Sequence, residues 1–543
     1  MDKTDWVVSK VVAAQARARG DKVFLQEIGG RALTYGETDT ATNRLANGLM
    51  KHGVAHGERV GVMLPNGLEI CLTWFALSRL GAVNVFINTA YKGAFLTHLL
   101  NNAETRLILI AAEFLPWLAD IEGEIPALKT AIVLGEIEAG TRAAFQRIEL
   151  LPYAEAAGGD QDRSPADAVE REVAYHDIGA IMYTSGTTGP SKGVLMPHAH
   201  LYLMGYGVVE NLRLSEADIY YICMPLFHAN ALLLQLFCSL IVGCKVVIAP
   251  RFSASAWLDH VREHGVTVTN TLGVMAGFIF RQPERPEDAD NALRLILAVP
   301  APTEIHEAFE QRFNTRLIEG YGMTEVNIPL YHPLDGPYRP GSCGKIYERF
   351  FEVRVVDPDT DQELPPGEMG ELVVRPREPF CFMQGYNRMP EKTVEAWRNF
   401  WFHTGDALKM DQDGYFYFID RIKDCIRVRG ENVSSYEIEA ILAEYPGVAE
   451  VAAIAVKSDL AGGEDEIKAC IVLKPGAETT PEALLDFCRE RMPHFAVPRY
   501  VEFTAALPKT PTEKVRKAQL REAGITPATW DREAAGYQVR RRA

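Results

Sequence analysis

Residues 183–193 read YTSGTTGPSKG and combine glycines, hydroxyl side chains and a single lysine directly after an apolar run. Glycines let backbone N–H groups come close to an anion, hydroxyls add donors, and Lys192 supplies positive charge. A flexible Gly/Ser linker is the simpler alternative, but linkers rarely follow an apolar strand or precede another apolar run. The stretch is therefore predicted to cradle a polyphosphate. It is not a P-loop, because the pattern GxxxxGK[ST] is absent.

The sequence around this stretch alternates between strand-like and helix-like patterns. From about residue 58 the runs RVGVML, LEICLTWFALSRLG, AVNVFI, GAFLTHLLNNA and RLILI follow one another. Such alternation is typical of βαβ units, so we predict an α/β fold in which helices flank parallel-rich sheets. The run IGAIMY is predicted to be the strand that delivers the chain to residues 183–193.

The pattern changes after residue 420. The strand-like runs VAEVAAIAV, IKACIVL and YVEF and the helix-like run PEALLDFCRERM are shorter units that fit a separate α+β domain. The remaining length, roughly 120 residues, is ordinary for a domain with its own core. We therefore predict a large N-terminal domain and a small C-terminal domain, with a boundary near Asp420.

The composition excludes several classes of function. A net charge of −16 would repel a nucleic-acid backbone, and no basic stripe is interleaved with aromatic residues, so nucleic acid is not an expected partner. The nine cysteines are scattered and never in CxxC spacing, which argues against a disulfide framework or a zinc site and favours a reducing compartment. The N-terminus lacks the apolar core of a signal peptide, and the most apolar run, ALLLQLFCSLIVGCKVVIAP, is interrupted too often to span a bilayer. We expect a cytoplasmic protein without an integral membrane segment, and that run is predicted to be a buried helix leading into a strand.

The chain resembles the adenylate-forming superfamily, which includes acyl-CoA synthetases, firefly luciferase and the adenylation domains of nonribosomal peptide synthetases. YTSGTTGPSKGV matches the signature loop of that superfamily without departure. Elsewhere, the motifs of this chain are most similar to those of carnitine/crotonobetaine–CoA ligases and medium-chain fatty-acyl-CoA ligases. Further matches follow in the superfamily's order along the chain: MPLFHAN, EGYGMTE, PGSCGK, GEMGEL, WFHTGD, DRIKDCIRVRGENVS and LPKTPTEKVRK.

This resemblance implies an ATP-dependent acyl-CoA synthetase, an acid–thiol ligase that uses ATP, Mg²⁺ and coenzyme A. The acid would react with ATP to give acyl-AMP and pyrophosphate, and the acyl group would then pass to the CoA thiol. Because two anions meet in the first step, such a site needs positive charge and a metal rather than a nucleophilic side chain. Lys192 would neutralise the departing pyrophosphate, and Glu325 with Thr184 would hold Mg²⁺. The β- and γ-phosphates would contact Ser185, Gly186, Thr187, Thr188 and Gly189.

The resemblance also assigns residues to the rest of the nucleotide. Tyr321 would pack against adenine and Thr324 would contact the α-phosphate. Asp406 and Arg421 would hold the ribose, because a carboxylate readily accepts hydrogen bonds from two vicinal hydroxyls. Taken alone, TGD and DRIKD could equally be surface turns. The remaining nucleotide contacts would be Val299, Pro300, Gly320, Gly322, Met323 and Ile419, with Val299 and Pro300 departing from the superfamily's usual GGAPLP.

By resemblance, residues 1–419 form the N-terminal adenylate-forming domain, 420–424 the hinge and 425–543 a mobile C-terminal lid. Rotation at Lys423 would swing the lid between an adenylating and a thioester-forming pose. Lys514 would bridge the carboxylate and the α-phosphate in the first of these poses. Here the sequence departs from the superfamily, because the residue before this lysine is a glutamate rather than a glycine.

Coenzyme A is expected beside the segment RVRGENVS. Gly430 would line the pantetheine tunnel, since a thiol arm needs close approach to the backbone. Arg429, which replaces a more common glycine, could approach a CoA phosphate or be a plain surface residue, and Glu431 belongs to the same motif. His228 would stand between the acyl pocket and the tunnel, although a lone histidine in an apolar stretch is more often a core residue.

The identity of the acid stays open. Asn270, Asn327 and Met275 make the expected pocket mixed, so a polar or ring-bearing acid is as credible as a fatty acid. No aspartate follows MPLFH where amino-acid-activating domains keep one for the substrate amine. Two other functions are considered: delivery of acyl-AMP to a carrier protein or an amine, and a noncatalytic nucleotide-binding role; a homodimer is compatible with the resemblance. The expected acyl-pocket residues are His228, Asn230, Gly273, Met275, Val326 and Asn327.

Overall fold

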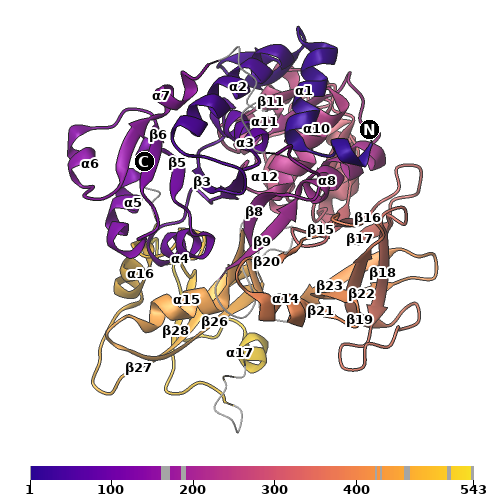
Figure 1. The fold of residues 1–543 in the computed structure, drawn as a ribbon. Helices are drawn as coiled ribbons and strands as arrows, with labels where there is room; N and C mark the ends of the chain where they lie inside the picture. The colour runs from indigo at the N-terminus through magenta and orange to yellow at the C-terminus, as the bar shows by residue number, and fades with distance from the viewer. Residues whose placement is uncertain are drawn as a thin grey trace. The chain divides into compact units, whose positions relative to one another are not determined.

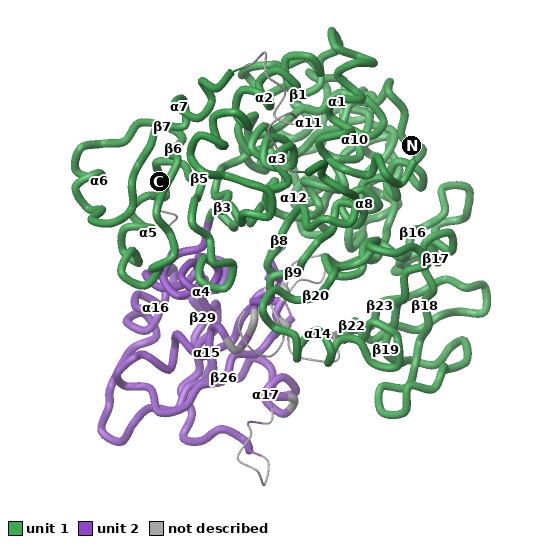
Figure 2. Tube along the Cα trace, viewed as in Figure 1, with its two compact units in different colours: residues 1–89, 100–183, 193–420 green, residues 90–99, 184–192, 421–543 purple. Residues whose placement is uncertain are grey.

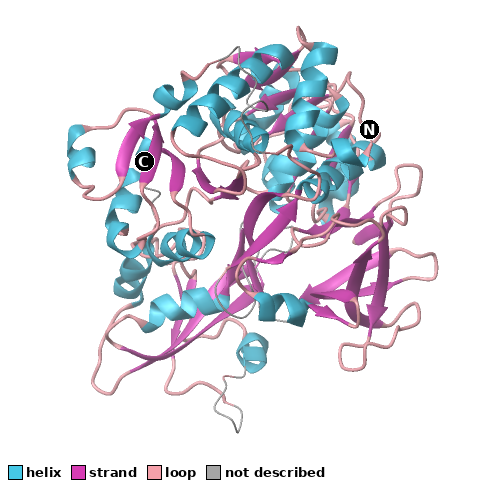
Figure 3. Cartoon of the chain, viewed as in Figure 1, coloured by secondary structure: helices cyan, strands magenta, loops and turns pink. Residues whose placement is uncertain are grey.

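The computed structural model describes residues 2–160, 171–184, 191–421, 425–428, 431–457, 465–509, 515 and 517–539. Helices and strands alternate along most of the chain (Figure 1 and Figure 3). The chain divides into two compact units, which Figure 2 colours separately. Unit 1 comprises Met1–Thr89, Leu100–Tyr183 and Gly193–Asp420, and unit 2 comprises Ala90–Leu99, Thr184–Lys192 and Arg421–Ala543.

Sheet 1 leads into the predicted phosphate loop. Its central strands are parallel, and an unbroken apolar strand such as LILIA in β5 is buried on both faces, as expected where helices cover a parallel sheet. Helix α2 (Tyr35–Lys51) begins with a capping box of Thr34 and Glu37, and α3 (Leu68–Leu80) ends at Gly81 with a φ of 65°. The strand order is β20 (Gly385–Tyr386), β9 (Lys192–Pro197), β8 (Ile178–Thr184), β4 (Val83–Phe86), β3 (Arg59–Met63), β5 (Leu107–Ala111), β6 (Thr130–Leu134) and β7 (Glu149–Pro152).

Sheet 2 contains a reversal of strand order. From β10 the chain passes through α9 (Ala229–Ala231), the π-helix η5 (Leu232–Phe237) and α10 (Cys238–Val242) to β11 on one side. Strand β12 pairs with the other side of β10, and from there α12 (Gly273–Phe280) leads further away to β13. The order is β14 (Leu317–Ile318), β13 (Leu295–Ala298), β12 (Val268–Thr271), β10 (Ile219–Ile222), β11 (Lys245–Ile248), β1 (Val23–Glu27) and β2 (Ala32–Thr34).

Sheet 3 is built from antiparallel pairs and carries the motifs EGYGMTE and WFHTGD. The two motifs overlap β15 and β22 of this sheet, so one sheet holds residues that are far apart in sequence. Helix α14 (Pro390–Ala396) leads into strand β21 (Trp397–Arg398), which forms a hairpin with β22 outside the main strand order of sheet 3. The order is β15 (Gly320–Met323), β16 (Asn327–Tyr331), β17 (Ser342–Ile346), β23 (Phe416–Arg421), β22 (Trp401–Met410), β19 (Met369–Pro376) and β18 (Phe351–Val356).

Unit 2 has an apolar core of its own. Residues such as Ile438, Leu442, Ile467 and Leu484 are fully buried there. The predicted order of strand, strand, helix and strand after residue 447 is present. No helix of the described residues is long and apolar enough to cross a bilayer. The elements are α4 (Gly93–Ala103), whose first part belongs to this unit, β24 (Cys425–Val428), β25 (Glu431–Ser434), α15 (Ser435–Ala443), β26 (Val448–Lys457), β27 (Asp465–Leu473), α16 (Pro481–Arg489), β28 (Tyr500–Phe503), α17 (Lys517–Ala523) and β29 (Trp530–Asp531).

Candidate active site

The predicted phosphate loop connects β8 to β9, which are neighbouring strands of sheet 1. The Tyr183 hydroxyl donates to Asn102 Oδ1 at 2.7 Å, and the Asn387 amide donates to the Asn102 carbonyl at 2.8 Å. The Asn387 backbone N–H in turn donates to the Gly193 carbonyl at 2.7 Å. A Cβ on Gly193 would lie 3.0 Å from the Tyr183 ring, so a side chain here would push the two strands apart. Among the predicted loop residues, Thr184 and Lys192 are partly exposed at the strand ends, whereas Ser185, Gly186, Thr187, Thr188 and Gly189 lie outside the described residues.

Within unit 2, the residue before Lys192 is tied to helix α15. The Ser191 backbone N–H and hydroxyl both donate to Glu437 Oε1, at 2.8 and 2.6 Å. Burial raises the pKa of Glu437, and the hydrogen bonds from Ser191 oppose that rise. His98 Nε2 donates to the Ser191 carbonyl at 2.9 Å. No sequence signal points to Glu437 or His98, because both lie far from Ser191 along the chain.

The residues predicted for adenine and for ribose are in direct contact. Tyr321, in β15, is 7% exposed and its hydroxyl donates to Asp406 Oδ2 at 2.6 Å. Asp406, in β22, is 3% exposed, and its backbone N–H donates to Thr404 Oγ1 at 3.1 Å. Thr404 then donates to the Leu372 carbonyl at 2.7 Å, which anchors the turn to β19. EGYGMTE and HTGD therefore form one polar cluster in sheet 3.

Glu325 is a buried carboxylate at the end of the EGYGMTE motif. It is 4% exposed, accepts a hydrogen bond from the Tyr386 hydroxyl at 3.1 Å, and its carbonyl accepts the Met383 N–H at 3.1 Å. A Cβ on Gly322 would lie 2.4 Å from the Asn327 carbonyl, so this turn tolerates only glycine. A Cβ on Gly320 would lie 3.0 Å from the Leu330 carbonyl, while Met323 and Thr324 are half-buried.

Glu319, directly before Gly320, was missed by sequence reasoning. It is 5% exposed, and burial raises its pKa to about 8, although a hydrogen bond from the Ala301 backbone works against the rise. Its Oε2 atom has no hydrogen-bond partner among the described residues. Val299 and Pro300, joined by a cis peptide bond, come just before Ala301. The available signal was an acidic residue directly after the apolar pair Leu317–Ile318, at the end of a buried strand.

The predicted acyl-pocket residues come from three segments of unit 1. His228 and Asn230 follow β10, Gly273 and Met275 lie in α12, and Val326 and Asn327 form the turn into β16. His228 is half-buried against Phe227, with ring centroids 4.6 Å apart. Asn230 accepts a hydrogen bond from Asn270 at 2.7 Å, so two of the polar residues expected in the pocket are in contact. Val326 and Asn327 are fully buried, and Met275 is 7% exposed.

The predicted lid and CoA residues are described only in part. Ile419 lies in β23 and is 44% exposed, and Glu431 begins β25 half-buried. Arg421 ends β23, and its side chain lies outside the described set. Lys423, Arg429, Gly430 and Lys514 lie outside the described residues.

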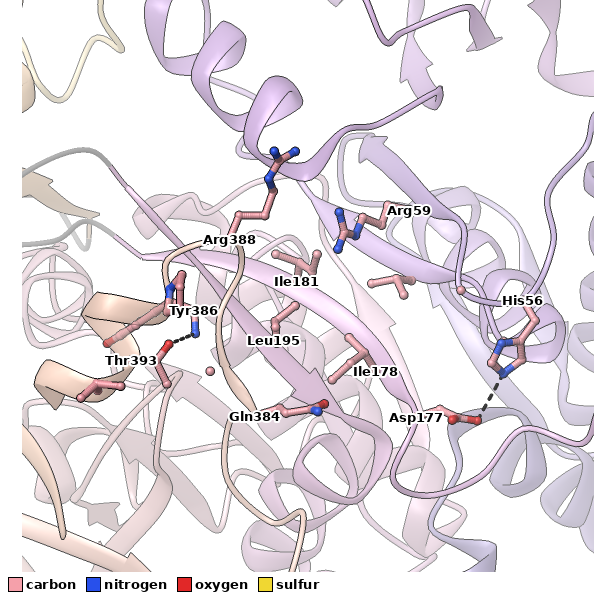
Figure 4. Close-up of a pocket in the computed structure, with 16 residues that line it drawn as sticks. His56, Arg59, Asp177, Ile178, Ile181, Leu195, Gln384, Tyr386, Arg388 and Thr393 are labelled. Carbon is pink, nitrogen blue, oxygen red and sulfur yellow. Dashed lines mark hydrogen bonds and ion pairs between the residues drawn. The ribbon is translucent and has the colours of Figure 1, made fainter. Parts of the chain in front are cut away.

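A cavity of about 670 Å³ lies elsewhere in unit 1 (Figure 4). Its apolar floor is Ile178, Ile181 and Leu195, and its rim carries Arg59 and the His56–Asp177 pair at 3.3 Å. Arg59, Val83 and Ile178 are the first residues of their parallel strands. The cavity is therefore at the amino ends of these strands, whereas the phosphate loop follows the carboxyl end of β8.

Comparison with known proteins identifies the class of enzyme. A family profile described as AMP-binding enzyme matches residues 12–387, and one described as AMP-binding enzyme C-terminal domain matches residues 437–514. The α/β fold and the two matched profiles are those of an adenylate-forming enzyme. The chain belongs to the AMP-binding enzyme family.

Relatives extend over nearly the whole chain. A crotonobetaine/carnitine–CoA ligase of Salmonella paratyphi A is 30% identical over 498 residues, which covers 90% of this chain and 93% of that one. The anthranilate CoA ligase AuaEII, solved with anthranoyl-AMP, is 27% identical with a TM-score of 0.70 and coverage of 96% and 99%. ATP-bound MatB from Rhodopseudomonas palustris is 28% identical with a TM-score of 0.67 and coverage of 95% and 98%. The predicted superfamily, its enzyme class and the α/β fold are confirmed.

Proposed function

We propose that this chain is an ATP-dependent acid–CoA ligase. A carboxylate oxygen attacks the α-phosphorus of ATP, the bond to the β-phosphate breaks, and pyrophosphate leaves. The CoA sulfur then attacks the acyl carbon, loses its proton, and AMP leaves. The observation that supports this proposal is the 2.6 Å hydrogen bond between Tyr321 and Asp406, the residues predicted to contact adenine and ribose.

Tyr321, Asp406 and Glu319 form the nucleoside end of the proposed site. Asp406 accepts from the ribose hydroxyls while Tyr321 holds that carboxylate in place and packs on adenine. Glu319 has a pKa of about 8, so it is mostly protonated at neutral pH and offers both an O–H donor and a carbonyl acceptor. That pair of groups matches the amino group and ring nitrogen of adenine, and a charged carboxylate would not. The floor is completed by Val299 and Pro300.

The phosphate end of the proposed site has an acidic and a basic part. Glu325 and Thr184 would hold Mg²⁺, which prefers hard oxygen ligands and often takes one carboxylate together with substrate phosphates. The donor set fits in type, because Glu325 is a buried carboxylate and Thr184 carries a hydroxyl oxygen. When bound, Mg²⁺ supplies charge neutralisation at the phosphates. Lys192 stabilises the charge that develops on the pyrophosphate.

Domain alternation completes the proposed cycle. Residues 425–543 act as the lid on residues 1–419 and rotate at 420–424 around Lys423. Lys514 enters the site for adenylation, and a second pose brings Arg429, Gly430 and Glu431 to coenzyme A. Lys514→Ala should abolish adenylation yet spare thioester formation from supplied acyl-AMP, whereas the surface variant Lys457→Ala should change neither half-reaction. A folded Lys514→Ala protein that has lost both half-reactions contradicts this division.

The experiment for the function is pyrophosphate release with ATP and Mg²⁺ across carboxylic acids, each with and without CoA. The panel contains short and medium fatty acids, aryl acids, carnitine-like acids and steroid side-chain acids. Turnover that needs both one acid class and CoA supports the ligase. A single CoA-independent burst of pyrophosphate supports another acceptor, such as a carrier protein or an amine. Bound ATP without any turnover supports a noncatalytic nucleotide-binding protein.

The cellular setting is part of the same proposal. The described cysteines are free and buried, which suits a reducing compartment, so we place the enzyme in the cytoplasm. We also propose a homodimer, which sedimentation of the purified chain tests directly.

A further inference from the structure

A chain of polar side chains lies where the strand order of sheet 2 reverses. The connection from β10 runs to β11 on one side, and the connection from β12 runs to β13 on the other side. In open α/β sheets the carboxyl ends of two such strands form a crevice that binds ligands. Asn230 follows β10, and Asn270 lies near the end of β12, so both residues lie on the side of the sheet where such a crevice is expected.

Four side chains are joined there by hydrogen bonds. The Tyr220 hydroxyl donates to Asn270 Oδ1 at 2.6 Å, and Asn270 Nδ2 donates to Asn230 Oδ1 at 2.7 Å. Gln235 Nε2 donates to the same Asn230 oxygen at 3.2 Å. Tyr220, Asn270 and Gln235 have no exposed surface, whereas Asn230 is half-buried. Asn230 is therefore the only one of these four side chains with accessible surface.

The buried end fixes the direction of these hydrogen bonds. Because Tyr220 is deeply buried, its phenol proton needs an acceptor inside the protein. Among the described residues, that acceptor is Asn270 Oδ1. If both asparagine amides were turned round, this proton and the Gln235 Nε2 protons would lose their acceptors. The observed direction leaves only one acceptor, Gln235 Oε1, without a partner among the described residues. Leaving buried donors without acceptors is costly, so the observed direction is favoured.

This direction determines which atom Asn230 presents to a ligand. Its oxygen accepts two hydrogen bonds from inside the protein, so its Nδ2 group is left facing outward. Among the described residues, that nitrogen makes no hydrogen bond. Asn230 also closely precedes the π-helix η5, a rare helix type that is frequent at functional sites.

We propose that Asn230 is a specificity-determining residue that donates a hydrogen bond to a neutral oxygen on the acyl part of the substrate. The preferred acids then carry a hydroxyl, keto or ether oxygen in addition to the reacting carboxylate. The oxygen is neutral because Tyr220, Asn270 and Gln235, which hold Asn230, are uncharged. This inference rests on the proposed ligase function. A site that pairs a buried polar group rejects an analogue lacking the partner oxygen far more strongly than an apolar pocket rejects a missing methylene.

The test compares matched acids by CoA-dependent pyrophosphate release. The pairs are 3-hydroxybutanoate with butanoate, 4-oxopentanoate with pentanoate, and 4-methoxybenzoate with 4-ethylbenzoate. We expect kcat/KM for at least one oxygen-bearing acid to exceed that of its partner by roughly 10- to 100-fold. Asn230→Leu, which keeps the branched shape of the side chain but has no donor, should reduce that ratio to about one by lowering kcat/KM for the oxygen-bearing acid.

Tyr220→Phe is the second variant. It removes the phenol proton that fixes the amide direction but keeps the buried ring, so selectivity should fall in a protein that still folds, with a lower thermal midpoint because the buried Asn270 oxygen loses its donor. Asn211→Leu, at the end of α8 (His198–Asn211), is the control and should leave the ratio unchanged.

The outcomes separate this inference from the proposed function. Equal activity on both members of every pair overturns the role of Asn230 and leaves the ligase intact. A ratio that persists in folded Asn230→Leu and Tyr220→Phe proteins overturns it as well. Absence of pyrophosphate release from every acid of this set and of the wider panel overturns both.

Discussion

The Tyr321 hydroxyl and the Asp406 carboxylate, which belong to different motifs, meet at 2.6 Å in sheet 3. Each residue is nearly buried, so the hydrogen bond is shielded from water and the carboxylate is held in one orientation. The proposed nucleoside site is therefore pre-organised by β15 and β22 and does not depend on ordering of either strand by ATP.

Asp406→Asn should weaken ATP use because the amide keeps the shape but loses the charge that accepts two hydroxyl donors. Hydrogen bonds to charged groups contribute about 1.5–3 kcal/mol, so KM for ATP should rise about 10- to 100-fold. Tyr321→Phe removes only the positioning hydroxyl and should raise KM by about threefold to tenfold. Steady-state kinetics at saturating acid measure both. An unchanged KM in Asp406→Asn would remove Asp406 from the nucleotide site.

Gly193→Ala should lower adenylation because the new methyl group would sit 2.9 Å from Ile181 Cγ2 and 3.0 Å from the Tyr183 ring. Overpacking of this kind costs about 1–3 kcal/mol, and here it displaces both ends of the phosphate loop. We expect kcat/KM for ATP to fall about 10- to 100-fold. Gly140→Ala is the matched control, since a Cβ at Gly140 meets nothing within 4 Å. If both variants kept full activity, the loop ends would not be held as tightly as these contacts imply.

The elements of this fold follow from local sequence, but several contacts of the site do not. The strands and helices between residues 58 and 111 are predicted by unbroken apolar runs and by helical periodicity, which need no knowledge of the partners. Tyr220 and Asn270 are 50 residues apart, and Ser191 and Glu437 are 246 apart, so their pairing depends on strand order and packing. The π-helix at 232–237 has no simple sequence signal, because the same apolar run fits an ordinary helix.

Burial of single polar groups was also beyond the sequence. Glu319 and Asp406 look alike in composition, each an acidic residue beside a glycine. Packing raises the pKa of Glu319 through burial, whereas Asp406 accepts a hydrogen bond from the hydroxyl of Tyr321. The motif EGYGMTE therefore indicated a nucleotide site but not which of its acidic residues is neutral.

Glu319 should make stability depend on pH. Its pKa is about 8 in the folded protein and near the ordinary value of 4.5 when unfolded, so the folded state holds the proton more tightly. The stabilisation from this group is complete below about pH 4.5 and is lost as pH rises through 8. Between these limits the free energy of unfolding should fall by about 1.4 kcal/mol per pH unit from this group alone.

Glu319→Gln imitates the protonated side chain and should lack that dependence. Urea unfolding of both proteins at pH 6, 7 and 8 measures the difference, which should grow with pH in favour of the variant. Parallel curves for the two proteins would show that Glu319 does not stay protonated in the fold.

Phe400→Gly should stabilise the protein although it removes a large apolar side chain. Pairing of Arg398 with Trp401 leaves Asn399 and Phe400 as a two-residue hairpin loop, with φ of 50° and 64°. Asparagine tolerates this region, but other residues with a Cβ are strained there by about 1–2 kcal/mol, and Phe400 is 85% exposed, so burial does not offset the strain.

Glycine relieves the strain at a cost of about 0.5–1 kcal/mol in chain entropy, which leaves a gain of about 0.5–1 kcal/mol in the free energy of unfolding. The urea midpoint should rise in Phe400→Gly and fall in Phe418→Gly, where a 43% exposed phenylalanine lies within strand β23, so glycine brings its entropy cost and also removes the buried part of the ring. A lower midpoint in Phe400→Gly would mean that the exposed ring makes a contact whose stabilisation exceeds the strain of the loop.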